Sequence, residues 1–365
     1  MTAQATARRH SVFHRLTVSD VERLTNDAVA VTFDVPAELA DEYRFAPGQH
    51  VNVALPDGDD TRRSYSICAA PSEGRLRIAV KRIPGGEFSA YALEGLAPGA
   101  TLDVMTPAGR FTPQLDPANA KHYVAIAAGS GITPVYSIIA AVLETEPASR
   151  VTLLYGNRTS RSVMFLEELA DLKDRYLERF HIVHILSREA MDLELTSGRI
   201  DRNRLGRLLD TVLPADSVDD WFLCGPYAMV TELRGLLVGR GVDAGHVHSE
   251  LFHVGDVPPV VLEVTEPLAE GSVGSVVSVV LDGRRTTVTI EDADETVLEA
   301  VLRERNDAPF ACKGGVCGTC RAKLVDGEVA MERNYALEDD EVAAGYVLTC
   351  QSHPTTPEVS LDYDA

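Results

Sequence analysis

The chain has 365 residues, of which 45% are hydrophobic and 24% are charged. This composition excludes a disordered, collagen-like or coiled-coil protein. The length predicts two or three domains, each large enough to bury a core. No run of 18 apolar residues occurs, and no apolar signal segment follows the N-terminus. We therefore expect a cytoplasmic protein without a membrane span.

The charge of the chain is strongly negative and unevenly distributed. A net charge of −21 has the wrong sign for a protein that grips nucleic acid. Residues 256–365 alone contain 22 acidic and 8 basic residues. An acidic C-terminal third suits docking on a basic protein partner, although an ordinary solvated surface has the same composition.

The first part of the chain, residues 14–118, consists of short β-rich runs separated by turns that contain Gly, Pro and Asp. This pattern predicts an antiparallel barrel or sandwich, with one short helix over 89–96. From residue 119 to about 253 the pattern changes, and continuous apolar runs alternate with helical periodicity. That alternation predicts a doubly wound α/β domain. Its expected strands are 122–128, 150–155, 180–186 and 220–224, and its expected helices begin after Thr133 and cover 163–178, 201–210 and 226–241.

The last third begins with a segment, 255–274, that is rich in Pro, Gly and acidic residues and predicts a linker. Two β-branched runs around an Asp-Gly turn then predict a hairpin over 275–290. A helix is expected over 295–305, directly before a cysteine-rich loop.

Four of the six cysteines form the sharpest chemical signal in the sequence. Cys312, Cys317 and Cys320 have the spacing C-x4-C-x2-C, and Cys350 follows later. Thiolates are soft ligands, and this spacing is typical of a plant-type [2Fe–2S] cluster. A structural zinc site also accepts four cysteines, but paired C-x2-C knuckles would favour it and only one such pair is present. We expect Cys68 to be a packed thiol.

Two further groups of residues have the chemistry of a flavin and nucleotide site. Arg63–Ser66 lie on a predicted strand, and Val80–Arg82 and the glycine-rich Gly85–Ser89 follow it. An arginine can pair with a pyrophosphate, a tyrosine ring can cover a heterocycle, and a turn entering a helix offers backbone donors to phosphate. Each of these motifs is weak evidence alone, but their order before an α/β domain strengthens the prediction of a flavin site.

The nucleotide signal begins at Gly129–Pro134, between the first parallel strand and its helix. Its glycines allow close approach of a nucleotide, although the motif departs from G-x-G-x-x-G. Tyr155–Arg158 and Cys224–Pro226 end later strands, where ligands bind in open α/β sheets. No acidic residue follows the second strand to bind a ribose hydroxyl. A 2′-phosphate, and hence NADPH, is favoured by Arg158, Ser160 and Arg161 in the loop after this strand. Exposed arginines are, however, also common on any solvated surface.

In this order, R-S-Y-S, G-S-G-I-T-P, Y-G-N-R, C-G-P and the cysteine spacing resemble the ferredoxin–NADP reductase superfamily fused to a plant-type ferredoxin domain. The likeness spans the chain after residue 12. Residues 62–92 and 155–189 most resemble the reductase components of phenylacetyl-CoA epoxidases, and ketosteroid 9α-hydroxylase reductases share the layout. The implied domains are an FAD-binding β-barrel at 12–118, an NAD(P)-binding domain at 119–254, a linker at 255–274 and a β-grasp ferredoxin domain at 275–365.

The resemblance also implies roles for individual residues. Tyr65 would stack on the isoalloxazine with Ser66 near N5, Cys224 would flank the nicotinamide, and Glu250 would lie near the flavin. The choice of FAD over FMN depends on the resemblance alone. The implied catalytic residues are Ser66, Cys224 and Glu250. The implied FAD residues are Arg63, Ser64, Tyr65, Ser66, Val80, Lys81, Gly86, Glu87, Phe88, Ser89 and Phe252. The implied NAD(P) residues are Gly129, Gly131, Thr133, Pro134, Asn157, Arg158, Arg161, Cys224, Gly225 and Pro226. The implied cluster ligands are Cys312, Cys317, Cys320 and Cys350.

The implied function is electron transfer from NADPH (or NADH) through FAD and a [2Fe–2S] cluster to an oxygenase. By resemblance, that oxygenase is a di-iron enzyme that epoxidises phenylacetyl-CoA in phenylacetate degradation. One alternative is an NADH-dependent reductase of a Rieske-type oxygenase. Another is an electron carrier or binding module that does not oxidise NAD(P)H itself. A third is a flavoprotein with a structural zinc. The histidines at 181, 184, 246, 248 and 253 lack neighbours that would complete a metal site, and we expect them to be ordinary strand residues.

Overall fold

The structure is a computed structural model that describes residues 12–55, 62–190, 193–253, 272–337 and 339–365. Among these residues, the chain divides into two compact units. The larger unit consists of residues 15–55 and 65–253. The smaller unit consists of residues 272–365 together with 12–14 and 62–64. Most of the predicted linker, up to residue 271, lies outside the described residues.

The larger unit begins with a six-stranded antiparallel sheet in the order β4-β3-β6-β1-β2-β5. Its two end strands meet where Ile67 pairs with Ile78, so the sheet closes into the predicted barrel. Apolar side chains such as Leu16, Val51 and Leu102 alternate inward and form its core. Its elements are β1 (Phe13–Thr25), β2 (Ala28–Asp34), β3 (His50–Ala54), β4 (Arg63–Ser66), β5 (Leu76–Lys81), α1 (Glu87–Glu94) and β6 (Thr101–Met105).

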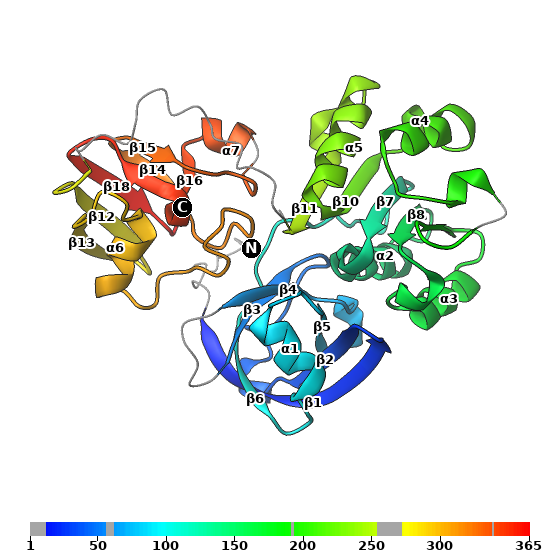
Figure 1. The fold of residues 1–365 in the computed structure, drawn as a ribbon, viewed down its shortest axis with the longest axis horizontal. Helices are drawn as coiled ribbons and strands as arrows, with labels where there is room; N and C mark the ends of the chain where they lie inside the picture. The colour runs from blue at the N-terminus through cyan, green and yellow to red at the C-terminus, as the bar shows by residue number, and fades with distance from the viewer. Residues whose placement is uncertain (1–11, 56–61, 191–192, 254–271, 338) are drawn as a thin grey trace. The chain divides into compact units, whose positions relative to one another are not determined.

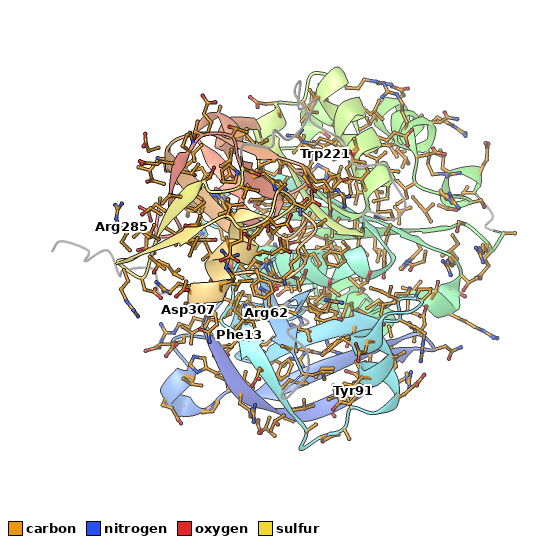
Figure 2. The ribbon with its side chains drawn as sticks, turned by 60° about the vertical axis from the view of Figure 1, so that its left-hand side comes forward. Phe13, Arg62, Tyr91, Trp221, Arg285 and Asp307 are labelled. Carbon is orange, nitrogen blue, oxygen red and sulfur yellow. The ribbon has the colours of Figure 1, made fainter. Side chains whose placement is uncertain are left out.

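The rest of the larger unit is the predicted α/β domain, a five-stranded parallel sheet in the order β11-β10-β7-β8-β9 (Figure 1). Helices α2 and α3 pack on one face of the sheet, and α4 and α5 pack on the other. The sole tryptophan, Trp221, is fully buried in β10 (Figure 2). The elements are β7 (His122–Ala128), α2 (Ile132–Thr145), β8 (Arg150–Asn157), α3 (Leu166–Arg175), β9 (Phe180–Leu186), α4 (Arg202–Thr211), β10 (Asp220–Pro226), α5 (Tyr227–Gly239) and β11 (Val247–His253).

One predicted helix starts later than its periodicity suggests. The pattern predicts a helix from residue 163, whereas α3 begins at Leu166. Phe165 has a φ of 57°, in the left-handed region, which interrupts a right-handed helix. The strained residue is buried and its ring stacks on that of Tyr136, with centroids 5.2 Å apart. Tertiary packing therefore overrides the local helical pattern at this point.

The smaller unit contains a mixed five-stranded sheet in the order β13-β12-β18-β14-β16, with α6 packed against it. The predicted hairpin is β12–β13, and β12 also pairs in parallel with β18. Thr296 caps α6, because its hydroxyl accepts the N–H of Glu299 and the Glu299 carboxylate accepts the N–H of Thr296. The elements are β12 (Val276–Leu281), β13 (Arg284–Thr289), α6 (Val297–Glu304), β14 (Arg321–Asp326), β15 (Val329–Met331), α7 (Asp339–Ala343), β16 (Tyr346–Leu348), β17 (Ser352–Pro354) and β18 (Glu358–Asp362).

Candidate functional site

Three residues that are far apart in the sequence meet in the larger unit. The hydroxyl of Ser66, at the end of β4, donates to Glu250 Oε2 at 3.2 Å, and Glu250 lies on β11. Cys224 on β10 is the register partner of Glu250. The structure thus brings together Ser66, Cys224 and Glu250, the three residues predicted to be catalytic.

Burial keeps this trio uncharged. It raises the pKa of Glu250 to about 8, and the hydrogen bond from Ser66 offsets only part of that rise. Burial also raises the pKa of the Cys224 thiol, and the nearby Glu250 carboxyl adds to the effect. At neutral pH the side chain of Glu250 therefore holds a proton, and it can donate a hydrogen bond in a site that disfavours charge.

The aromatic and glycine-rich residues beside Ser66 suit a flat heterocycle and a phosphate. The rings of Tyr65 and Phe88 lie 5.3 Å apart at 35°. Gly85 has a φ of 73°, and Gly86 is the N-cap of α1. The buried Ser89 hydroxyl donates to the Gly86 carbonyl at 2.9 Å and accepts the Ile83 N–H at 3.1 Å. The Ser89 side chain thus holds the turn itself, and its contact with a pyrophosphate stays a prediction.

The glycine-rich turn after β7 is packed tightly against β10. A Cβ on Gly131 would collide with the Cys224 carbonyl oxygen, so only glycine allows this approach. The Thr133 hydroxyl donates to the Ser130 carbonyl at 3.0 Å. The Pro134 and Thr133 side chains are buried in the first turn of α2. The predicted nucleotide turn therefore lies beside the Cys224–Pro226 strand end.

Tyr155, the first residue of the Y-G-N-R motif, supports this turn, a role that the sequence analysis did not assign to it. Its hydroxyl donates to the Gly129 carbonyl at 3.1 Å and accepts the Met164 N–H at 3.3 Å, and the side chain is fully buried. A tyrosine at the end of a buried strand was the available signal, because a buried phenol requires hydrogen-bond partners.

The loop after β8 carries the residues predicted to select the nucleotide. Arg158 and Arg161 are exposed, whereas Asn157 is buried. Glu189, a residue missed by sequence reasoning, reaches this loop from the segment after β9. Its carboxylate accepts the Ser160 N–H at 2.7 Å and the Ser160 hydroxyl at 3.1 Å. These two donors were expected to face a 2′-phosphate.

The remaining predicted residues are distributed around these elements. Arg63 is exposed and donates to the Arg62 carbonyl at 2.9 Å. Lys81 Nζ lies 3.8 Å from Asp27 Oδ2. Val80 is buried in the barrel core, and Ser64, Glu87 and Phe252 are half-buried or exposed.

In the smaller unit, the four predicted cluster ligands form two pairs. The thiols of Cys312 and Cys317 are hydrogen-bonded to one another, and so are those of Cys320 and Cys350. Among the described residues, no group of three or more His, Cys, Asp or Glu side chains converges to hold a single metal ion. A [2Fe–2S] cluster takes two thiolates on each iron, so this pairing fits the cluster better than a tetrahedral zinc site.

Backbone donors and glycines surround the cysteine pairs. The N–H groups of Gly314 and Val316 point at Cys312 Sγ, at 3.3 and 3.4 Å. The bond from Cys317 and these backbone donors lower the pKa of Cys312 to about 5. Gly315 has a φ of 76°, and a Cβ there would lie 3.0 Å from the Arg333 carbonyl oxygen. These contacts favour the thiolate form of Cys312, one of the four predicted ligands.

Two of the strand histidines prove to be more than isolated residues. Asp220 Oδ1 lies 3.1 Å from His246 Nδ1 and 3.1 Å from His248 Nε2, and Asp220 Oδ2 accepts Lys121 Nζ at 2.9 Å. Burial opposes the charge of Asp220, but the hydrogen bonds from His248, Lys121 and His246 lower its pKa to about 2. Asp220 thus forms an ion pair with Lys121 and hydrogen bonds with two histidines, and these contacts join β10 to its neighbours.

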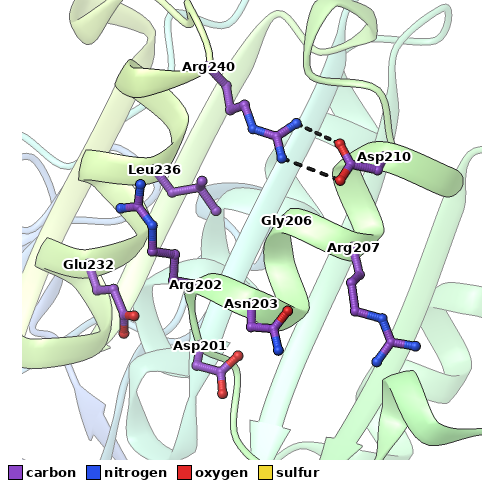
Figure 3. A pocket seen from close by; sticks show the side chains of 9 residues that line it. All are labelled: Asp201, Arg202, Asn203, Gly206, Arg207, Asp210, Glu232, Leu236 and Arg240. Carbon is purple, nitrogen blue, oxygen red and sulfur yellow. Dashed lines mark hydrogen bonds and ion pairs between the residues drawn. The ribbon is translucent and has the colours of Figure 1, made fainter.

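A hollow of about 630 Å³ lies between α4 and α5 (Figure 3), and neither Ser66 nor Glu250 lines it. Two of its arginines form ion pairs, Arg240 with Asp210 at 2.6 Å and Arg207 with Glu194 at 2.8 Å. None of the helices in the described residues is long and apolar enough to cross a bilayer.

Comparisons with known proteins agree with this arrangement. Three family models match the chain: an oxidoreductase FAD-binding domain at residues 15–112, an oxidoreductase NAD-binding domain at 125–234 and a 2Fe-2S iron-sulfur cluster binding domain at 279–355. The chain thus contains the three cofactor-binding domains of an electron-transferring oxidoreductase.

Similar proteins share the whole length of the chain. One of the subunits of 1,2-phenylacetyl-CoA epoxidase from Escherichia coli is 46% identical over 97% of this chain and 99% of its own. The ferredoxin reductase component of 3-ketosteroid-9-alpha-monooxygenase from Rhodococcus rhodochrous is 32% identical over 95% and 96%. The structure of phthalate dioxygenase reductase superposes with a TM-score of 0.56 at 26% identity, covering 96% of this chain and 98% of that one. The chain therefore belongs to the family of flavin-dependent, [2Fe–2S]-containing oxygenase reductases that includes these proteins.

Proposed function

We propose that the protein supplies electrons to a di-iron oxygenase of the phenylacetyl-CoA epoxidase type in aerobic phenylacetate degradation, with NADPH as the donor. The observation that carries this proposal is the 46% identity with the Escherichia coli epoxidase component over 97% of the chain. The identity with the ketosteroid monooxygenase component is lower, at 32%. We also retain the domain limits 12–118, 119–254, 255–274 and 275–365 as part of the proposal.

The bound groups supply the redox chemistry. Bound FAD would supply hydride acceptance and single-electron release, and a bound [2Fe–2S] cluster would supply one-electron transfer. The chain supplies the binding and the protons. Tyr65 and Phe88 would hold the flavin ring, and the Gly85–Gly86 turn would hold its pyrophosphate. The protonated Glu250, bonded to Ser66, would keep a proton beside the ring while excluding charge.

The two halves of the nucleotide site have separate tasks. Cys224 and Thr133 would hold the nicotinamide near Ser66, at the turn where Gly131 packs against Cys224. Arg158 and Arg161, both exposed, would meet a 2′-phosphate, and this supports NADPH over NADH. The Glu189 carboxylate on Ser160 opposes such a phosphate, so the preference depends on displacement of Glu189 from the loop.

The acceptor in this proposal is an oxygenase component that docks on the smaller unit. That unit carries most of the acidic excess of residues 256–365, and its Cys312 is exposed while Cys320 and Cys350 are buried. Thiolate ligands that must stay reduced suit the cytoplasm, where we place the protein.

A Rieske-type oxygenase is the second candidate acceptor, because relatives at 32% identity serve a ketosteroid monooxygenase and a glycine betaine monooxygenase. Reconstitution separates the two. The purified holoprotein is mixed with a phenylacetyl-CoA epoxidase oxygenase or with a Rieske oxygenase, and NADPH-dependent product formation is measured. Turnover with the Rieske oxygenase alone would overturn the proposal.

Anaerobic titration tests the electron path itself. We expect NADPH to bleach both flavin and iron–sulfur absorbance by about three electrons per chain, two on the flavin and one on the cluster. A flavin spectrum with zinc instead of iron would overturn the relay. An absence of bleaching by either nucleotide would leave a carrier that does not oxidise NAD(P)H.

A further inference from the structure

The buried guanidinium of Arg77 connects the barrel and the α/β domain of the larger unit. This residue lies on β5 of the barrel, and only 2% of its side chain is exposed. Its Nη2 lies 2.5 Å from Glu22 Oε2 and 3.2 Å from Glu168 Oε1. Glu22 belongs to β1 of the same barrel, whereas Glu168 belongs to α3 of the α/β domain. A single guanidinium is thus paired with one carboxylate from each domain.

The surroundings of Arg77 extend this connection. Its guanidinium carbon lies 5.3 Å from the centre of the Phe165 ring, next to the start of α3. The Ser137 hydroxyl on α2 donates to the Ala69 carbonyl at 2.6 Å, and the Ser72 hydroxyl bonds the Glu144 carboxylate. Ala69 and Ser72 lie three and six residues after Ser66 in the chain. These contacts therefore continue the one that Ser66 makes with Glu250.

A buried guanidinium needs a carboxylate partner, because an unpaired buried charge is strongly unfavourable. Glu22 meets that need within the barrel. Glu168 is not required for the barrel to fold, yet its bond to Arg77 ties α3 to β5. Loss of Glu168 would leave both domains folded and the Ser137–Ala69 and Ser72–Glu144 bonds in place, but it would remove the ion pair that ties α3 to β5. Small misplacements of reacting groups slow reactions by large factors.

We propose that the Arg77–Glu168 pair is a positioning contact that holds the nicotinamide-binding domain against the flavin barrel in the geometry for flavin reduction. This inference rests on reduction of the flavin by NAD(P)H, and it adds a residue pair outside the predicted site. Glu168 acts through the domain orientation and touches neither cofactor in this scheme.

Two matched substitutions test it, since Glu168→Gln and Glu22→Gln remove a carboxylate from the same nitrogen of Arg77. In the holoprotein, the limiting rate of flavin bleaching at saturating NADPH is measured by anaerobic stopped flow. We expect Glu168→Gln to lower this rate about tenfold with the flavin midpoint potential unchanged, and Glu22→Gln to leave it within about twofold. A purely structural role predicts the reverse order, because the Glu22 bond is the shorter one.

Amide hydrogen exchange supplies a readout that does not depend on activity. Exchange in residues 68–72 and in α3 should rise in Glu168→Gln but not in Glu22→Gln. Equal rates and equal exchange in the two variants would overturn the proposal. If Glu168→Gln does not fold, Glu168→Asp decides instead, because it keeps the charge but shortens the side chain that reaches Arg77. A slower limiting rate with an unchanged potential supports the contact, and an unchanged rate overturns it. A wild-type protein that NADPH cannot reduce would instead overturn the proposed function.

Discussion

The two units build their sites in opposite ways. In the smaller unit, three of the four predicted cluster ligands lie within nine consecutive residues, Cys312 to Cys320, and only Cys350 comes from elsewhere. In the larger unit, Ser66 and Glu250 are 184 positions apart and meet only because a barrel and a parallel sheet are packed together. A site held by one loop is visible in sequence spacing, whereas a site between domains is not.

The electrostatics of the two sites differ as well. Hydrogen bonds from Cys317 and from backbone N–H groups lower the pKa of Cys312, so one thiol of this pair favours the anion while the pKa of its partner Cys317 is raised. Burial raises the pKa of Glu250, so the trio in the larger unit favours the neutral form. The first arrangement suits ligands of iron, and the second suits a site that handles a proton next to an uncharged ring.

Removal of a cluster ligand is the clearest test of whether the sites in the two units work independently. We expect Cys317→Ser to lose the cluster and to slow delivery to cluster-dependent one-electron acceptors by ~100-fold or more. Reduction of the flavin by NADPH should survive, because its site lies in the larger unit. Iron content, visible spectra and stopped-flow reduction are the measurements.

Cys68→Ser is the matched control, since Cys68 is a buried cysteine of the barrel outside the cluster loop. It should retain iron. If Cys317→Ser folds correctly and still loses flavin reduction, the independence of the two sites is wrong.

The Asp220 network gives the largest expected effect on stability. The folded-state pKa of Asp220 is about 2, below its ordinary value of 3.8, so its contribution is present above pH 4 and is lost as the pH falls towards 2. We expect Asp220→Asn to lower the free energy of unfolding by ~2 kcal/mol at pH 7 and by progressively less below pH 4. Chemical denaturation across this range measures the difference.

Asp210→Asn is the matched control, because Asp210 forms its ion pair with Arg240 on the exposed surface. Its stability should match that of the wild type at every pH. A pH-independent loss in Asp220→Asn would mean that packing, and not charge, is responsible.

The nucleotide loop gives a smaller and more specific effect. Arg158→Ala should lower kcat/KM for NADPH ~10-fold and leave NADH within about twofold, since one charge-assisted phosphate contact is removed. Glu189→Gln should act in the opposite direction and raise the NADPH-to-NADH ratio about threefold, because a carboxylate beside a phosphate is repulsive. Steady-state kinetics with both nucleotides tests the pair. Equal changes for the two nucleotides would remove the 2′-phosphate role.

The smallest expected effect is local to the smaller unit. Thr296→Ala removes the capping box of α6 and should destabilise that unit by ~1 kcal/mol. Thermal bleaching of the iron–sulfur absorbance should shift to lower temperature while flavin release does not. A parallel shift of both transitions would show that the two units unfold together.

Local pattern was enough for much of this protein. Alternating β-runs, and the change to apolar runs followed by helical periodicity, are properties of neighbouring residues, and they correctly predicted the barrel and the α/β domain. The spacing of Cys312, Cys317 and Cys320 likewise predicted a cluster domain, because a short glycine-rich loop limits where its thiols can go.

Only the tertiary structure decided the contacts between distant segments. Nothing near Ser160 in the sequence indicates that Glu189 bonds it, and nothing near Arg77 indicates Glu168. The start of α3 is also a tertiary outcome, because Phe165 leaves the helical region to stack on Tyr136. Side-chain pairs between separate elements have no period along the chain. Packing determines them, and the positioning contacts and the nucleotide preference depend on them.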